Sequence, residues 1–160
     1  MQDGLNQLLL KNPYIYAVFI VAFWCFVCFA ISLFSGWLTL ARRFRRQSEP
    51  YGDTKSAGPF FYTVYMRFWC HYNSVIRIVV AEDAVYLSVI FFFRFGHPPL
   101  RIPWNEIRIS ETKWFFRRCL VLTCGELECI PVRISVRMAR NLGILERLPN
   151  EMLSNGTSPT

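Results

Sequence analysis

Acidic and nucleophilic side chains are too few and too scattered after residue 46 to predict a catalytic site. This part of the chain holds two Asp, eight Glu and two His. Glu106 and Glu111 lie five residues apart, so on one strand they would face opposite sides of a sheet. General acid–base chemistry needs such groups to converge on one point. The sequence contains no GxSxG, P-loop or HExxH motif, and we predict that the protein is not an enzyme.

His97 is the one titratable residue in the short, proline-rigidified sequence of residues 96–99, Gly-His-Pro-Pro. Because histidine changes charge near neutral pH, His97 is a candidate contact for a ligand or a pH-sensitive partner. The alternative, which we favour, is that its ring hydrogen-bonds the backbone and holds this turn in place.

Three arginines surround the same segment and form the candidate anion-binding cluster, namely Arg77, Arg94 and Arg101. Guanidinium groups bind phosphate and carboxylate through paired hydrogen bonds. The alternative is that these are ordinary solvated arginines. A second candidate contact is the run Trp114-Phe115-Phe116 between two predicted strands. Three aromatic residues at a turn are candidates for contact with a bilayer or a protein partner.

The cysteine spacing favours reduced thiols over a disulfide framework or a metal site. Two of the six cysteines, Cys25 and Cys28, lie inside an apolar stretch. The other four have no paired CxxC spacing and make no usual zinc spacing with either histidine; they are Cys70, Cys119, Cys124 and Cys129. We predict neither a metal ion nor an organic cofactor.

A long apolar stretch precedes all of these residues. Residues 14–41 contain no charged side chain, and 28 helical residues would extend about 42 Å, against about 30 Å for the hydrocarbon core of a bilayer. Asn12 and Pro13 are typical of a helix N-cap and first position. The sequence therefore predicts a transmembrane helix over residues 13–41. A cleaved signal peptide is disfavoured because the stretch is too long and has no basic segment before it.

Four arginines follow the apolar stretch at once and form a basic collar, Arg42, Arg43, Arg45 and Arg46. By the positive-inside rule, the C-terminal part lies in the cytoplasm and residues 1–12 lie outside, in a single-pass protein of the cell (inner) membrane. The collar supplies four of the seven net positive charges, so the basic composition does not predict nucleic-acid binding. The collar either only sets this topology or also binds anionic lipid headgroups.

The remaining chain divides into a linker, one domain and a tail. Residues 42–59 form the collar and a polar linker, and residues 149–160 a disordered tail. Within residues 60–148, alternating, aromatic and β-branched segments predict about seven antiparallel strands, among them residues 60–71, 75–81 and 85–93. An apolar stripe from Ile134 to Leu148 predicts a C-terminal amphipathic helix with Ser135 as its N-cap. The fold class is thus a transmembrane helix followed by a mainly β (α+β) domain.

Two sequence segments carry a resemblance to a family. They are the strand VYLSV at residues 85–89 and the run FRFGHPPLRIPWNEI at residues 93–107. Together they resemble uncharacterised bacterial single-span membrane proteins with a cytoplasmic pleckstrin-homology-like (GRAM or bacterial PH-type) domain. The resemblance implies a PH-like fold over residues 60–148 and no established activity.

These observations predict a membrane-anchored, non-catalytic docking module at the cytoplasmic membrane surface. The expected partners are the lipid bilayer, anionic lipid headgroups or another membrane protein. The alternative is a small accessory subunit of a larger membrane complex, in which the helix packs against other helices.

Overall fold

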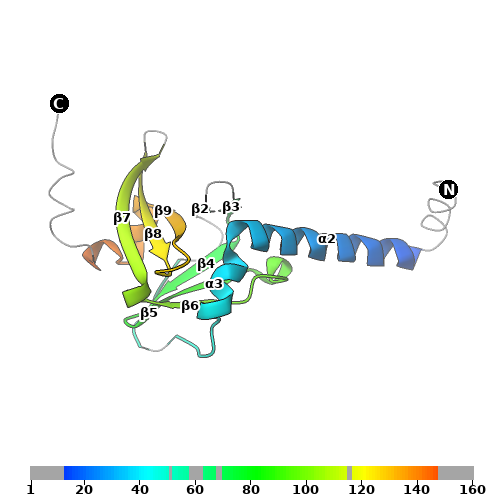
Figure 1. The fold of residues 1–160 in the computed structure, drawn as a ribbon, viewed down its shortest axis with the longest axis horizontal. Coiled ribbons are helices and arrows are strands. Elements are labelled where there is room, and N and C mark those ends of the chain that lie inside the picture. The colour runs from blue at the N-terminus through cyan, green and yellow to red at the C-terminus, as the bar shows by residue number, and fades with distance from the viewer. Residues whose placement is uncertain (1–12, 51, 58–62, 68–69, 115–116, 148–160) are drawn as a thin grey trace.

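The structure is a computed structural model, and it describes residues 13–50, 52–57, 63–67, 70–114 and 117–147. A long helix projects from a β domain as a single arm (Figure 1). The domain contains two antiparallel sheets, with nine strands among the described residues, and a short C-terminal helix. This α+β layout confirms the predicted fold class at the level of a long N-terminal helix followed by a mainly β domain.

The arm is helix α2 (Pro13–Ser35), which begins at the predicted proline. It is long and apolar enough to cross a membrane. Almost all of its side chains are exposed, and Cys28, Ser32 and Ser35 alone among its residues are buried. A core helix of a water-soluble protein would show a wide buried face instead.

The predicted helix over residues 13–41 is wrong at its C-terminal end, because the helix breaks at Gly36. Gly36 has a φ of 80°, in the left-handed region, and a second helix, α3 (Trp37–Phe44), starts immediately after it. Trp37 and Leu40 of α3 are fully buried in the β domain. The final apolar residues of the uncharged stretch therefore belong to the protein core.

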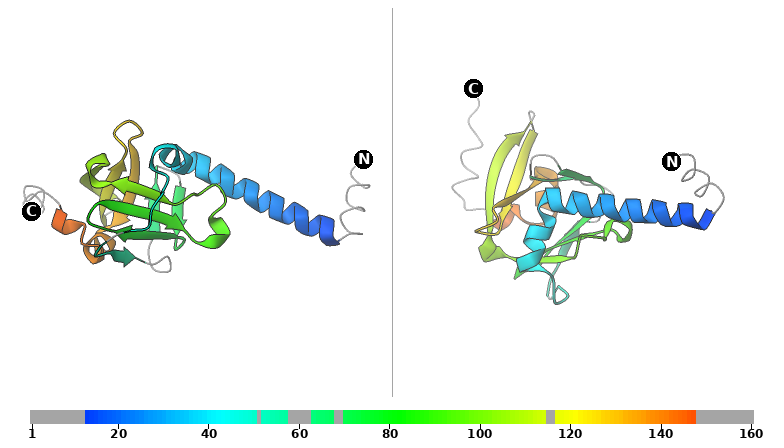
Figure 2. Two further views of the ribbon diagram at one scale, coloured as in Figure 1. Left: turned by 90° about the horizontal axis from the view of Figure 1, so that it is seen from below. Right: turned by 45° about the vertical axis from the view of Figure 1, so that its right-hand side comes forward.

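The first sheet has the strand order β1-β4-β5-β6. Its strands are β1 (Lys55–Ala57), β4 (Ile76–Val80), β5 (Ala84–Val89) and β6 (Leu100–Pro103). The second sheet has the order β3-β2-β9-β8-β7. Its strands are β3 (Cys70–Asn73), β2 (Thr63–Met66), β9 (Ile130–Ser135), β8 (Arg117–Cys124) and β7 (Ile107–Trp114). The two sheets and the short helices share one apolar core, visible from two further directions in Figure 2.

Several predicted elements are shorter or divided in the structure. The aromatic run before Asn73 forms a hairpin, β2–β3, in place of one strand. The predicted strand over residues 85–93 ends at Val89, and Phe91–Phe93 form a 3₁₀ turn, η1. A second 3₁₀ turn, η2 (Trp104–Glu106), precedes β7.

The C-terminal helix is also shorter than predicted. Helix α4 spans Val136–Asn141 and is followed by a 3₁₀ turn, η3 (Leu145–Arg147). Its N-cap is the predicted residue, because Oγ of Ser135 accepts a hydrogen bond from the backbone N–H of Met138. Gly143, with a φ of 69°, follows directly on the last turn and divides the predicted stripe.

The described residues of the collar and linker, 42–50 and 52–57, are part of the folded domain. Arg43 of α3 forms ion pairs with Glu106, which lies just before β7, and with Glu128, which lies between β8 and β9. The backbone N–H of Arg46 donates to the carbonyl of Pro99, 2.8 Å away. β1 pairs with β4 inside the predicted linker. The helix and the β domain are consequently joined without a flexible spacer.

Candidate functional site

The Gly-His-Pro-Pro segment packs against the end of α2 and the start of α3. The hydroxyl of Ser32 donates to the carbonyl of Gly96. The indole N–H of Trp37 donates to the carbonyl of Pro98 at 2.8 Å. A Cβ on Gly96 would lie 3.1 Å from Cα of Phe29, so the glycine allows the loop backbone to approach the helix closely.

His97 lies inside this junction and is 2 % exposed. Its Nδ1 is 3.2 Å from the carbonyl of Phe95, and its Nε2 is 2.9 Å from the hydroxyl of Tyr72. The Tyr72 hydroxyl is also 2.8 Å from Oγ of Ser35. The one proton of the Tyr72 phenol is donated to Oγ of Ser35, and the tautomer of His97 sets which atom donates between Nε2 and the phenol oxygen.

Burial sets the ionisation of this junction. Loss of water contact lowers the pKa of His97 and keeps the ring neutral, although the bonds to backbone carbonyls partly oppose the shift. Burial likewise raises the pKa of Tyr72, so the phenol stays protonated. Ser32 and Ser35, which join the same junction, are buried as well. The ring of His97 is enclosed, and its contacts agree with the favoured alternative that it holds the turn.

The structure brings two of the three candidate arginines onto one sheet face. Arg77 of β4 pairs with Ser88 of β5, and Arg101 of β6 pairs with Tyr86 of the same strand. These four side chains therefore lie on the same side of the first sheet. Arg94 lies outside the sheet, in the loop between β5 and β6.

The two arginines on the shared face differ in their partners. Arg101 forms an ion pair with Asp83 at 2.7 Å. That hydrogen bond holds the pKa of Asp83 below its usual value and raises the pKa of Arg101. Arg77 is exposed and lines a pocket instead. Of the predicted cluster, Arg77 is the member best placed to meet a ligand.

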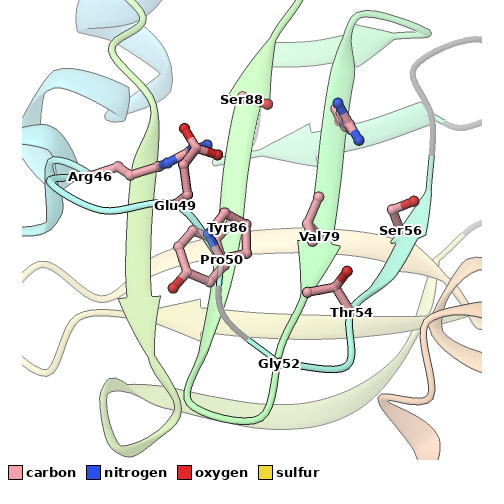
Figure 3. Close-up of a pocket in the computed structure, with 10 residues that line it drawn as sticks. Arg46, Glu49, Pro50, Gly52, Thr54, Ser56, Val79, Tyr86 and Ser88 are labelled. Atoms are coloured by element: carbon pink, nitrogen blue, oxygen red, sulfur yellow. The ribbon is translucent and has the colours of Figure 1, made fainter.

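This pocket has a volume of about 210 Å³ and lies on the outer face of the first sheet. Figure 3 shows Arg46, Glu49 and Pro50 on one side of it and Thr54 and Ser56 on the other, with Tyr86 and Val79 of the sheet between them. Its lining is mostly polar. The lining residues are Arg46, Glu49, Pro50, Gly52, Thr54, Ser56, Arg77, Val79, Tyr86 and Ser88.

The charges of the pocket favour a small anion. Arg46 forms an ion pair with the exposed Glu49, and its guanidinium lies 5.9 Å from the centre of the Tyr86 ring. Arg77 adds a second positive charge to the lining. The hydroxyls of Thr54 and Ser88 supply further hydrogen-bond donors. An incoming phosphate or carboxylate would compete with Glu49 for Arg46 and bind Arg77 directly.

The remaining predicted sites contribute no reactive centre. Trp114 ends β7, whereas Phe115 and Phe116 lie outside the described residues. Burial raises the pKa of the Cys124 thiol to about 12, so it remains protonated. Among the residues that the structure describes, no group of three or more Cys, His, Asp and Glu side chains is arranged to bind a metal ion.

Sequence reasoning missed three features of these sites. It did not include Tyr72 or Ser35, because their contact with His97 joins segments far apart in the chain. It assigned Phe91–Phe93 to a strand, although three successive phenylalanines followed by Arg94 and Phe95 do not alternate as a half-buried strand does. That lack of alternation was the available signal.

No protein-family model matches the chain, and comparisons with curated proteins and with solved structures gave no match.

Proposed function

We propose that the protein is a single-pass membrane protein whose β domain is a non-catalytic docking module at the cytoplasmic face of the membrane. In this proposal α2 crosses the bilayer, the N-terminal side is outside, and the domain belongs to the PH-like proteins that its sequence resembles. Support for the span comes from the length and exposure of α2. Support for the orientation comes from the arginines that follow it.

The observation that carries the docking role is the pocket lined by Arg46 and Arg77. Ser88, which faces Arg77 across the sheet, lies only three residues before the loop that packs along α2. The pocket is therefore close to the end of the domain that α2 enters, within reach of the headgroup layer. We propose an anionic phospholipid headgroup as its ligand.

The test uses the full chain in nanodiscs of phosphatidylcholine, which has no net charge. Glycerophosphoglycerol, the soluble headgroup of phosphatidylglycerol, is titrated in and binding is followed by calorimetry. We expect saturable binding that weakens with added salt. Arg77→Gln should weaken it about tenfold, because a charge-assisted hydrogen bond is worth about 1.5–3 kcal/mol.

Arg137→Gln is the matched control, because it removes the same charge from an exposed position on α4. Equal binding by the wild type and Arg77→Gln would contradict the proposal. Binding of an acidic peptide, but not of the headgroup, would assign the pocket to a protein partner and would also contradict it.

A further inference from the structure

The loop between β5 and β6 lies along α2 and does not project freely from the domain. The indole N–H of Trp24 donates to the carbonyl of Phe92 at 3.0 Å. The rings of Trp24 and Phe93 are 5.2 Å apart. Further along α2, the hydroxyl of Ser32 donates a hydrogen bond to the carbonyl of Gly96. Figures 1 and 2 show this green loop reaching back beside the blue helix.

The level that the loop reaches can be compared with the thickness of a membrane. Trp24 lies eleven residues before Ser35 and eleven residues after Pro13, so about 16 Å of helix extends on either side. A hydrocarbon core is about 30 Å thick. Neither half of α2 can span it alone. Any position in which α2 crosses a bilayer therefore places Trp24, and with it Phe92, inside the hydrocarbon region.

The side chains of this loop suit an apolar surrounding. Phe91, Phe92 and Phe95 are 80 %, 73 % and 55 % exposed. In water each of these phenyl rings would forgo most of the free energy that its burial could contribute. On α2, Trp24 beside Phe93 and Phe29 beside Gly96 are exposed as well. The loop and the helix thus present one continuous aromatic surface.

Several backbone carbonyls of the loop accept hydrogen bonds within the protein, which lowers the cost of placing them in hydrocarbon. The carbonyl of Ile90 accepts from the N–H of Phe93, and the carbonyl of Phe91 accepts from the N–H of Arg94. Two further carbonyls accept hydrogen bonds from side chains of α2: that of Phe92 from Trp24 and that of Gly96 from Ser32.

Arg94 is the one charged residue of the loop, and its side chain is exposed. It lies between Phe92, at the level of Trp24, and Gly96, at the level of Ser32. A long arginine side chain can extend its guanidinium several ångströms to reach the phosphate layer while its backbone remains below. Arg94 would then fix the depth of the loop.

We infer that residues 91–95 form a re-entrant aromatic anchor that enters the same leaflet as the C-terminal half of α2. This inference rests on the membrane span of the proposed function and is independent of any ligand in the Arg77 pocket. The partner is the acyl-chain layer of that leaflet. The β domain is thereby attached to the membrane at two adjacent points.

The test places the photoreactive residue p-benzoylphenylalanine at position 92 in the full chain, which is reconstituted in phosphatidylcholine nanodiscs. After irradiation, intact-mass spectrometry reports whether the adduct carries phospholipid or protein. Phe23→p-benzoylphenylalanine on the exposed face of α2 is the reference for a lipid-exposed site. Leu127→p-benzoylphenylalanine is the negative control, because Leu127 is 86 % exposed on the distant turn between β8 and β9.

We expect phospholipid adducts at positions 92 and 23 and none at position 127. Lipid adducts at position 23 without any at position 92 would overturn the anchor while leaving the span in place. Protein adducts at position 92 would assign the aromatic surface to a second copy or another subunit and would also overturn it. Absence of lipid adducts at position 23 would overturn the span and the anchor together.

Discussion

The phenol oxygen of Tyr72 lies 2.9 Å from Nε2 of His97, and this pair joins the β2–β3 hairpin to the loop that packs on α2. Both residues come from the β domain, yet the same phenol contacts Ser35, the last residue of α2. Three segments of the chain therefore meet at one oxygen atom. The stability of the helix–domain junction should depend on this atom.

Tyr72→Phe removes the hydroxyl and retains the ring. Nε2 of His97 then loses its hydrogen-bond partner while it stays buried, and we expect the free energy of unfolding to fall by about 1–3 kcal/mol. Thermal unfolding of the purified chain in detergent measures the change. Tyr65→Phe is the control, since Tyr65 is 41 % exposed, whereas Tyr72 is buried. Equal midpoints for the two variants would show that the junction does not depend on the hydroxyl.

The stability should also depend on pH through His97. Burial lowers the pKa of His97 in the folded state, so the unfolded chain binds more protons between that lowered pKa and about 6.5. We therefore expect full stability above about pH 6.5 and a progressive loss below it. Melting curves recorded from mildly alkaline to mildly acidic buffer measure this slope.

His97→Asn should be less stable at neutral pH and should lose most of the slope. His71→Asn, at an exposed position on β3, should retain it. A slope that persists in His97→Asn would assign the pH dependence to another group.

Gly36→Ala tests the break between α2 and α3. An alanine at a φ of 80° costs roughly 1–2 kcal/mol from backbone strain alone. In addition, its Cβ would lie 2.6 Å from Cδ1 of the fully buried Ile130. Gly52→Ala is a matched control, because Gly52 has a φ of 81° and a Cβ added there would meet no atom within 4 Å. We expect Gly36→Ala to be clearly the less stable of the two in denaturant titrations.

Arg43 should contribute to stability, in contrast with its neighbour Arg42. Arg43→Gln leaves Glu106 and Glu128 without their ion pair, and we expect a loss of about 1 kcal/mol, since the arginine is partly exposed. Arg42→Gln, which removes the same charge from an exposed position, should change the unfolding midpoint little. Similar losses in both variants would contradict a specific role for the Arg43 pairs.

The orientation can be tested with the Asn155-Gly156-Thr157 sequon in the tail. With the C-terminal side in the cytoplasm, this asparagine never meets the glycosylation machinery of a eukaryotic host. We expect no mass shift on glycosidase treatment of the expressed chain. A sequon added before Lys11 should be used, and glycosylation at Asn155 in its place would reverse the assigned topology.

Local patterns predicted much of this architecture. The uncharged stretch predicted a helix from Pro13, alternation over residues 75–81 predicted β4, and Ser135 was the predicted N-cap of the last helix. The end of the first helix was wrong because hydropathy cannot separate apolar residues that face lipid from those that enter a core. Trp37 and Leu40 are as apolar as the residues before them, and only the left-handed backbone of Gly36 divides the two groups.

The candidate site was harder to predict than the elements. The roles of Arg43 and Arg46 depend on Glu106 and Pro99, which lie far away in the sequence. The Arg77 pocket depends on where residues 46–50 and 52–56 lie on the sheet, and the pairing of β1 with β4 fixes the second of these segments. Long-range contacts of this kind leave no periodic signal in a single sequence.

The single-residue connection between α2 and α3 has a mechanical consequence. Because α3 is embedded in the core and the β5–β6 loop is bonded to α2, the helix and the domain move as one lever. A helix longer than the local bilayer thickness tilts to remain immersed. In a thinner bilayer, α2 would therefore incline the whole β domain by the same angle and change which of its surfaces faces the lipid headgroups.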